Sequence, residues 1–457
     1  MRSTALLALF CLQHVALAQQ EPTNISTDFS NTHRALGIST DGTMVLAVKG
    51  NQYVTMPFDS SQAGTFTSTG WNTATNPDIL WRPGTLEFYV TEIQPNGMIR
   101  VLRGSNANSN PTVVISDLPP TFRLREVTLG DQFLFGTQPG SFHAIVRIPT
   151  SGANLATPVA TFGFVDTVDL DCNVDPTGTR LLMTRTTPST KELRFQQLPA
   201  SGESTLLLTD PTIQNATWTS SQSCAFEIRQ GAFVQIGSVT TTNPGVLTTL
   251  TNGNRDHQQL SINQDLTTLT FFVRELTGST VESVPAIMPA VGGGIVLLTA
   301  YKEFLYTPTT NIVIQNNASG PRIAFDATWN APTGPDPTSQ IYVATLGDEL
   351  TITPRATLGS TLTAQLTNSG APTNVVLAWL HFNRINVPTA PPFINPILVE
   401  TANNLLVIPS TTGVLGTGTI PLPTDNIFIG VDIYMQAMTG TPTSFILSRM
   451  MEASIQQ

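Results

Sequence analysis

Short segments rich in Val, Ile, Leu, Thr and Phe recur along most of the chain, and polar turns separate them. Clear examples are residues 44–48, 86–90, 181–184 and 270–273. β-branched and aromatic residues suit a pleated strand, whereas Gly, Pro, Asn, Asp and Ser occupy tight turns. Amphipathic helical spacing is almost absent. The pattern therefore predicts an all-β protein.

These segments form a weak internal repeat. Each unit has a short strand, a tight polar turn, an apolar strand and a second alternating strand. The turns recur at intervals of 35 to 54 residues and are centred on positions 42, 84, 130, 178, 231, 266 and 320. A period of about 40–50 residues in an all-strand sequence is typical of four-stranded propeller blades. We therefore expect a six- or seven-bladed β-propeller over residues 31–348.

Two copies of the repeat resemble the WD40-like (PD40) repeats of TolB-type propellers. Residues 320–343 carry Ile-Ala-Phe and then Gln-Ile-Tyr-Val, and residues 175–182 read Asp-Pro-Thr-Gly-Thr-Arg-Leu-Leu. The resemblance covers about residues 30–348. It implies a propeller fold and a periplasmic or extracellular setting, but no reaction. TolB-type propellers mostly have six blades, whereas this chain has seven turn anchors.

The period stops near residue 353, and the remaining residues have a different organisation. Residues 353–457 contain several shorter strand-like runs at a spacing that suits a small β-sandwich. The stretch 418–423 followed by 427–436 is similar to a C-terminal sandwich found in exported bacterial proteins. We therefore expect a separate β-sandwich domain over residues 353–457.

The first 18 residues have the pattern of a secretory signal peptide. Arg2 supplies a charged start, residues 5–12 are apolar, and Ala16-Leu17-Ala18 forms a small-x-small cleavage site. Residues 19–30 are expected to form an N-terminal linker. No later stretch has the length of a transmembrane helix, so no membrane insertion is expected. The sequence predicts an exported protein, periplasmic or extracellular.

The charge balance narrows the choice of partner. The formal net charge is −10 and the isoelectric point is near 4.9. Nucleic acids and anionic membranes attract clustered Lys and Arg, which this chain lacks. A protein or glycan partner is therefore expected, and no nucleic acid.

Two cysteines, Cys172 and Cys224, remain after the predicted cleavage. An oxidising compartment lets them pair as a disulfide, and their distances from the turn anchors place both on innermost strands of adjacent blades. The alternative is two buried free thiols packed between blades.

An acidic stretch precedes the fourth turn anchor. Alternation along a strand places four of its side chains on one face: Asp169, Asp171, Asn173 and Asp175. Such a dense set of oxygen ligands suits Ca²⁺, which would be the only cofactor. The alternative is a polar strand that faces the water-filled propeller channel without a metal.

No catalytic residue can be assigned. The sequence has no G-x-S-x-G, H-E-x-x-H, Walker A or G-x-G-x-x-G motif, so prolyl-oligopeptidase-type activity is not expected. Carboxylates from separate blades could meet at the channel mouth, but residues of this type also hold turns. The candidates are Asp41, Glu126, Asp175 and Asp265. Four Trp residues could form a ligand platform or, alternatively, blade core: Trp71, Trp81, Trp218 and Trp329.

The sequence thus favours an exported, non-enzymatic binding or scaffold protein of the cell envelope or exterior. The alternative is a secreted propeller hydrolase or lyase acting on carbohydrate. General acid–base catalysis would need three or more acidic or His side chains to converge at one channel mouth, whereas scattered acids would favour the binding protein.

Overall fold

The fold was analysed in a computed structural model of the chain. The predicted signal peptide, residues 1–18, lies outside the residues that the structure describes. These residues are 22–456, with gaps at 75–76, 106–109, 129, 139–142, 163–171, 176–177, 199–203, 254, 278–279, 299–305, 318–319, 332–333, 336–337, 346–349, 354–355, 368–374, 382–383, 388–392, 395–396, 400–406, 411–414, 442–443 and 448–450.

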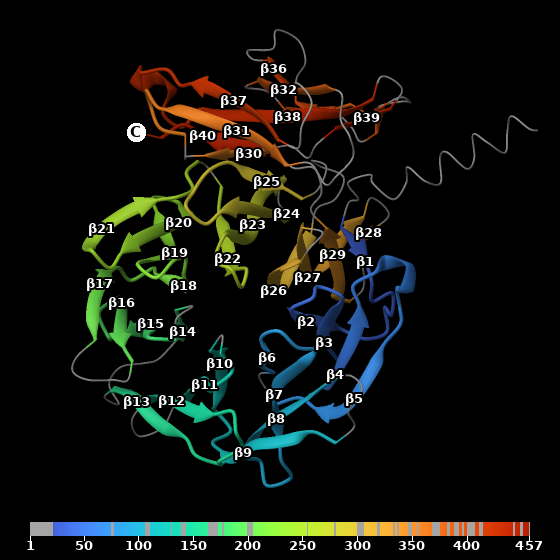
Figure 1. The fold of residues 1–457 in the computed structure, drawn as a ribbon, viewed down its shortest axis with the longest axis vertical. Coiled ribbons are helices and arrows are strands. Elements are labelled where there is room, and N and C mark those ends of the chain that lie inside the picture. Colours follow the sequence, from blue (N-terminus) through green and yellow to red (C-terminus); the bar gives the residue numbers. More distant parts are fainter. Residues whose placement is uncertain are drawn as a thin grey trace, which may run out of the picture. The chain divides into compact units, whose positions relative to one another are not determined.

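The chain is a seven-bladed β-propeller followed by further strands, as the all-β pattern predicted (Figure 1). Each of the first five blades is a four-stranded antiparallel meander. The first is β2(His33–Ile38), β3(Met44–Lys49), β4(Gln52–Pro57) and β5(Thr67–Asn72). The second is β6(Ile79–Trp81), β7(Glu87–Ile93), β8(Ile99–Ser105) and β9(Thr112–Leu118). The third is β10(Arg123–Val127), β11(Phe133–Gln138), β12(His143–Pro149) and β13(Thr157–Phe162).

The remaining blades complete the ring. The fourth is β14(Cys172–Val174), β15(Arg180–Thr186), β16(Lys191–Gln197) and β17(Thr205–Thr209). The fifth is β18(Gln214–Trp218), β19(Ser223–Gln230), β20(Phe233–Thr240) and β21(Asn243–Thr249). The sixth contains β22(His257–Ile262), β23(Thr268–Thr277) and β24(Thr280–Pro289). The seventh contains β26(Tyr306–Asn317), β27(Gly320–Ala331) and β29(Gln340–Thr345), with β28(Gly334–Pro335) paired to β27.

The N-terminal segment closes the ring. The expected linker over residues 19–30 instead supplies β1(Thr23–Asn24), which pairs with β29 as the outer strand of the seventh blade. Ile25 donates its N–H to the carbonyl of Ile341 at 2.9 Å, and the Ser26 hydroxyl donates to Gln340 Oε1 at 2.5 Å. The first and last segments of the propeller are thereby joined through one blade.

Six of the seven turn anchors mark the turn between the first and second strands of a blade; five lie between the strands, and Gly320 is the first residue of β27. The exception is Gly231, which lies between β19 and β20, the second and third strands of the fifth blade. The first turn of that blade uses serines, with Ser220 Oγ accepting the N–H groups of Gln222 and Ser223. Seven blades is thus one of the two numbers expected, although one anchor marked the wrong turn.

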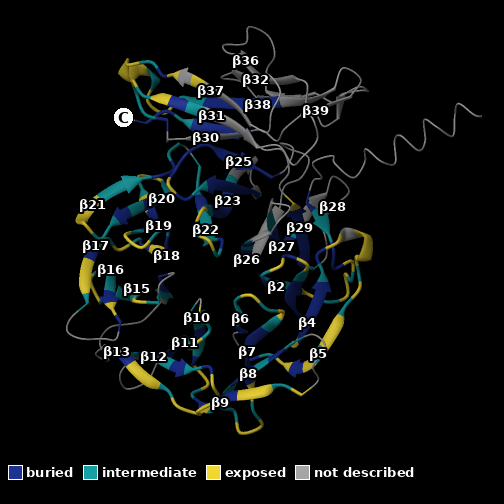
Figure 2. Ribbon diagram, in the orientation of Figure 1, coloured by how far each residue is buried: buried dark blue, intermediate teal, exposed yellow. Residues whose placement is uncertain are grey.

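The hydrophobic core lies between neighbouring blades rather than within one sheet. One cluster joins the second and third blades, and it includes Tyr89 and Val101 together with Phe122 and Leu134. Similar clusters lie between the first and second, third and fourth, fourth and fifth, and seventh and first blades. The buried middle of each blade is visible as dark strands in Figure 2. Each blade is thus held by its two neighbours, because an isolated four-stranded sheet would expose both faces.

The second compact unit contains residues 286–305 and 344–457. Its strands are β25(Ile295–Leu297), β30(Leu350–Thr353), β31(Thr361–Thr367), β32(Val375–His381), β33(Arg384–Val387), β34(Phe393–Ile394), β35(Ile397–Val399), β36(Val407–Ser410), β37(Leu415–Pro421), β38(Asp432–Thr441), β39(Ser444–Leu447) and β40(Met451–Ser454). Short 3₁₀ turns occur at η2(Ser60–Gln62) in the propeller and at η3(Asn426–Phe428) here. The described strands of this unit fit the all-β expectation, and a sandwich arrangement stays a prediction.

One segment of this unit comes from the middle of the propeller sequence. β25 pairs with β40 through Ile295 opposite Glu452 and Val296 opposite Met451. The compact unit thus includes residues 286–305 as well as 344–457. A separate domain over residues 353–457 stays a prediction. In the described part of the chain, no helix has both the length and the apolar character needed to cross a membrane.

Candidate functional site

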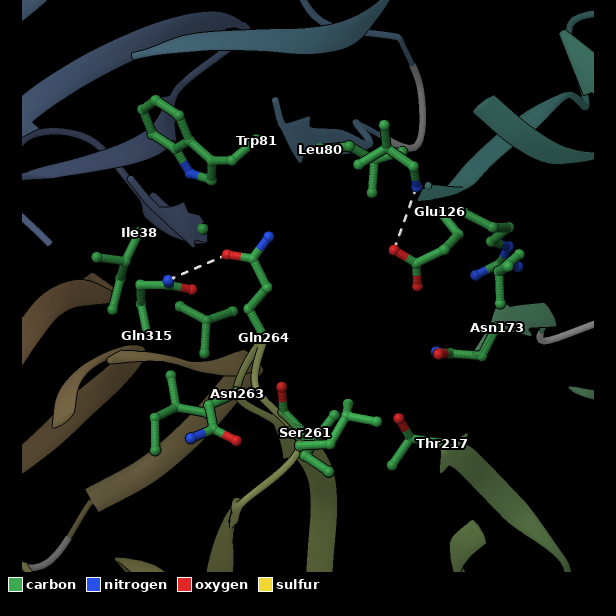
Figure 3. A pocket seen from close by; sticks show the side chains of 18 of the residues that line it. Ile38, Leu80, Trp81, Glu126, Asn173, Thr217, Ser261, Asn263, Gln264 and Gln315 are labelled. Atoms are coloured by element: carbon green, nitrogen blue, oxygen red, sulfur yellow. Dashed lines mark hydrogen bonds between the residues drawn. The ribbon is translucent and has the colours of Figure 1, made fainter. Parts of the chain in front are cut away.

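A cavity of about 440 Å³ lies in the propeller channel and is lined by residues from the innermost strands of all seven blades (Figure 3). These strands are β2, β6, β10, β14, β18, β22 and β26. A volume of this size is in the range of pockets that hold small ligands. The cavity is the place where the seven repeats bring their side chains together.

Equivalent positions can be identified from the first turn of each blade. In the first six blades, the residue that follows the innermost strand donates its N–H back across the turn. The residue two positions before this donor lines the cavity in every case. We call these residues the ring positions: Gly37, Leu80, Glu126, Asn173, Thr217 and Ser261.

β-bulges set the direction of several ring side chains. The pairing register shifts between Leu124 and Glu126 in β10, between Gln214 and Thr217 in β18, and between Gln258 and Ser261 in β22. A bulge adds a residue to one strand and changes the face to which the next side chain points. Each of these ring residues directly follows a bulge, and each lines the cavity.

The cavity has two chemically different sides. We call the ring residues of the third to sixth blades the polar arc, and they are Glu126, Asn173, Thr217 and Ser261. The apolar arc comes from the first two blades and consists of Ile38, Leu80 and Trp81. Figure 3 shows Ile38 and Trp81 on the side away from Asn173 and Thr217.

The apolar arc depends on a close contact between neighbouring blades. The Trp81 indole packs against Gly37, where an added Cβ would lie 2.9 Å from Nε1. The same indole meets Phe88 edge-on, with ring centroids 5.3 Å apart. Only a glycine at position 37 leaves room for this indole, so the first blade helps to hold Trp81 at the cavity wall.

At the end of the cavity near the first turns, Gln315 connects three blades. Its Nε2 donates to Gln264 Oε1 at 3.3 Å and to the carbonyl of Thr40 at 3.5 Å. Gln264 follows β22, Thr40 follows β2, and Gln315 belongs to β26. These hydrogen bonds link the seventh blade to the sixth and the first at the cavity.

Glu126 is the ring residue with an ionisable side chain. Its Oε1 accepts the N–H of Val127 at 3.2 Å. Burial raises the pKa of Glu126 to about 7, and the Val127 N–H opposes the shift. A carboxyl group that titrates near neutral pH in a cavity marks a candidate functional group.

Asp175 also lines the cavity, but its carboxylate holds a turn. Oδ1 accepts the N–H groups of Thr179 and Arg180, both at 2.8 Å. The side chain is 3% exposed. It follows the end of β14, so its main role is to close the first turn of the fourth blade.

The rest of the acidic stretch is only partly described. Asn173 lies in β14 and lines the cavity. Asp169 and Asp171 lie outside the described residues. Among the described residues, no three His, Cys, Asp or Glu side chains converge to hold a metal ion. A Ca²⁺ site formed by Asp169, Asp171, Asn173 and Asp175 therefore stays a prediction.

The two cysteines do not occupy equivalent strands. Cys172 belongs to the innermost strand β14, whereas Cys224 belongs to β19, the second strand of its blade. The prediction that both lie on innermost strands was therefore wrong for Cys224, because the anchor used for its blade was the second turn. Cys224 is a free, buried thiol whose Sγ lies 3.7 Å from the carbonyl oxygen of Val239. The side chain of Cys172 lies outside the described residues.

The other candidate acids hold turns. Asp41 accepts hydrogen bonds from Ser39 and Thr43, and Asp265 accepts one from Thr267. Of the candidate carboxylates, the described structure brings only Glu126 and Asp175 to the cavity.

The candidate Trp residues also separate by position. Trp71 and Trp218 are buried between blades, and Trp218 Nε1 donates to the carbonyl of Asn173 at 3.2 Å. Trp81 lines the cavity, whereas the side chain of Trp329 lies outside the described residues. The core interpretation thus holds for Trp71 and Trp218. Trp81 both lines the cavity and packs against the core cluster of the first two blades, so its role as a ligand platform stays a prediction.

Sequence reasoning named Glu126 only as one of four turn-associated acids and did not single out Thr217 or Ser261. The sequence signal that distinguishes these cavity-lining residues is their position, two residues before the residue whose N–H donates across the first turn of the blade. That offset can be read only when the first turn of each blade has been placed correctly.

No protein-family model and no curated protein matches the sequence. Solved structures nevertheless share the fold. A puromycin hydrolase mutant superposes with a TM-score of 0.52 and 12% identity, over 77% of this chain and 61% of the hydrolase. This chain therefore spans less than two thirds of the hydrolase's length.

Two further structures show the range of similar propellers. Oligogalacturonate lyase from Vibrio parahaemolyticus has a TM-score of 0.51 and 8% identity, over 72% of this chain and 97% of the lyase. TolB from Acinetobacter baumannii has a TM-score of 0.38 and 11% identity, over 67% of this chain and 78% of TolB. At these identities the likeness concerns the fold, and it leaves enzyme and non-enzyme functions open.

Proposed function

We propose that this protein is an exported, non-catalytic β-propeller that binds part of a protein or glycan partner in its channel, in the cell envelope or outside the cell. The observation that supports this proposal is the 440 Å³ cavity, to which all seven blades contribute. Its polar arc offers amide, hydroxyl and carboxyl groups, and its apolar arc offers a Trp surface. Such a mixture orients a ligand without requiring a reaction.

The scarcity of free acids at the cavity also favours binding. Acid–base catalysis on a glycosidic bond commonly uses two carboxyl groups. Of the two carboxyl residues that line the described cavity, Asp175 is committed to its turn. Glu126 is therefore left without an evident catalytic partner in the described part of the chain.

The test compares partner capture by the wild-type protein with capture by a variant in which a large side chain fills the channel. The wild-type protein should retain a protein from envelope fractions or a glycan from an array. Ser261→Trp, which places a large ring in the polar arc, should abolish that capture. Val246→Trp adds the same ring at an exposed position of β21 and should leave capture unchanged. If folded Ser261→Trp captures as well as wild type, the channel is not the binding site.

The second candidate function is a secreted hydrolase or lyase acting on carbohydrate. The neutral-range pKa of Glu126 favours it, because a general acid or base works best near the operating pH. Incubation with a set of oligosaccharides, followed by mass spectrometry of the products, tests this function. Products formed by wild type and absent with Glu126→Gln would establish it in place of simple binding.

A further inference from the structure

We propose that the channel cavity binds an organic ammonium group carried on an apolar stem, with the Glu126 carboxylate as its counter-ion. This inference rests on the proposed ligand-binding function and specifies the chemistry of the ligand. The same chemistry is offered by a free alkylamine and by a Lys side chain of a partner protein.

The polar arc brings one carboxyl side chain to the cavity. Glu126 lies in the polar arc, and in the described part of the chain its carboxylate accepts the N–H of Val127. Removing an ionised carboxylate from water is costly unless a cation or several donors compensate. A ligand cation would compensate the charge of the Glu126 carboxylate, for which the described protein supplies the backbone N–H of Val127.

Charged side chains of the neighbouring blades already have partners within the protein. Directly after the neighbouring strand β6, Arg82 pairs with Glu87 and with Asp131. Beyond β14, Asp175 is held by the backbone of its turn.

Two arginines share β10 with Glu126. Arg123 pairs with Asp78. Arg125 also lines the cavity and makes other interactions. The pKa of Glu126 is shifted by burial, which raises it, and by the Val127 N–H, which lowers it. An ammonium ligand would thus be the direct counter-ion of Glu126.

The geometry favours an ammonium over a guanidinium. Because Oε1 of Glu126 already accepts the Val127 N–H, Oε2 is the oxygen left to face a ligand. A guanidinium binds best to both oxygens of a carboxylate, whereas an ammonium is a point charge with three donors. Among the described residues, the buried hydroxyl of Thr217 has no hydrogen-bond partner, and it belongs to the same polar arc as Glu126.

The apolar arc would take the stem of the ligand. Ile38 and Trp81 lie on the side of the same cavity away from Asn173 and Thr217, and Leu80 is drawn next to Glu126 (Figure 3). An aromatic ring and two aliphatic side chains bury methylene groups favourably, because apolar surface is removed from water. A ligand with a charged head and an apolar stem matches both arcs at once.

Three probes that share one stem test the inference: 4-phenylbutylamine, 4-phenylbutanol and 4-phenylbutyrate. Their binding to the full chain is measured by calorimetry and by ligand-observed NMR at pH 8. We expect the amine to bind at least about tenfold more tightly than the alcohol, and the anion to bind least. Glu126→Gln should abolish the preference for the amine. Asp265→Asn removes the same charge at an exposed turn outside the cavity lining and should retain the preference.

A pH titration adds an independent readout. At pH 5.5 Glu126 of the wild type is protonated, so the amine should lose its advantage, while Glu126→Gln should show no change with pH. A lysine-containing peptide that binds when 4-phenylbutylamine does not would identify a partner's Lys side chain as the source of the ammonium.

Three results would overturn the inference. Equal binding of the amine and the alcohol would exclude the cation while leaving channel binding intact. A preference that survives Glu126→Gln would place the cation elsewhere. If none of the probes or peptides binds at millimolar concentration, the ammonium class is wrong. The proposed function is then decided separately, by whether Ser261→Trp abolishes partner capture.

Discussion

Asp78 and Arg123 form a bidentate ion pair that joins the second blade to the third. Arg123 Nη2 lies 2.6 Å from Asp78 Oδ1, and Nε lies 3.0 and 2.9 Å from the two carboxylate oxygens. Oδ2 also accepts the N–H of Leu124 at 2.9 Å. Asp78 is 8% exposed, so this carboxylate depends on its partners rather than on water. The pair fixes β10 next to β6, immediately before the bulge that directs Glu126 into the cavity.

Removing this carboxylate should destabilise the propeller. We expect Asp78→Ala to lower the free energy of unfolding by about 2–4 kcal/mol, because a partly buried guanidinium and a buried N–H lose their acceptor. Urea unfolding measures the change. In the Asp78→Ala background, Arg123→Met should cost much less than it does in wild type, since the pair is already broken. Equal costs in both backgrounds would mean that the pair contributes no coupling energy.

Glu126 should make stability depend on pH. Burial raises its folded pKa to about 7 from the ordinary 4.5, so the folded state binds a proton that the unfolded state releases. The stabilising contribution is complete below pH 4.5 and is lost as the pH rises through about 7. Glu126→Gln should therefore raise the unfolding free energy at pH 8 by roughly 1–3 kcal/mol and have little effect at pH 4. Melting curves across this range check the prediction, and a pH-independent difference would contradict it.

His257 should act in the opposite direction. It is 1% exposed, and burial lowers its pKa to about 3 from 6.5. The folded state keeps the imidazole neutral, so its contribution is present above pH 6.5 and is lost as the pH falls toward 3. His257→Leu should flatten the fall in melting temperature between pH 6.5 and 4. The comparison is made in the Glu126→Gln background, where the carboxyl no longer titrates. Parallel curves would show that another group causes the acid sensitivity.

Two glycines of the third blade should respond differently to the same substitution. A Cβ at Gly136 would overlap the Phe122 ring and lie 2.8 Å from the carbonyl oxygen of Arg123. At Gly130 the nearest atom is 3.9 Å away, and the backbone is not left-handed. Gly136→Ala should cost roughly 1–3 kcal/mol of unfolding free energy, whereas Gly130→Ala should be neutral or slightly stabilising. Chemical denaturation of both variants measures this, and equal effects would refute the packing argument.

The propeller repeat could be predicted, with six or seven blades, because tight first turns need special residues and thus mark the period. Gly42, Gly84 and Gly178 all have positive φ angles, which glycine adopts without strain. The fifth blade was misplaced because its first turn is built on serine hydroxyls, while its second turn contains a glycine. Closure of the ring by Ser26 and Gln340 joins residues 314 positions apart, and no local pattern reports such a pairing.

The site was harder to predict than the fold. Whether Glu126 points into the channel depends on the bulge at Arg125, and a bulge changes alternation without a characteristic residue. Asp175 of the next blade also carries a carboxyl group. It lies two positions after the ring residue Asn173, where it closes a turn. Sequence spacing alone could not separate these two roles, because the difference arises from strand register.

Cys224 provides the final prediction, on the state of the thiols. It lies among buried apolar residues of the fourth and fifth blades, and burial raises the pKa of its thiol to about 12. Since the thiolate is the reactive form, Cys224 should resist iodoacetamide at pH 8 in the folded protein and react fully in urea. Peptide mass spectrometry under non-reducing conditions follows both cysteines in the same sample. A peptide pair linked through Cys172 and Cys224 would instead establish the disulfide expected for an oxidising compartment. In that case, neither thiol would be alkylated in urea until a reductant was added.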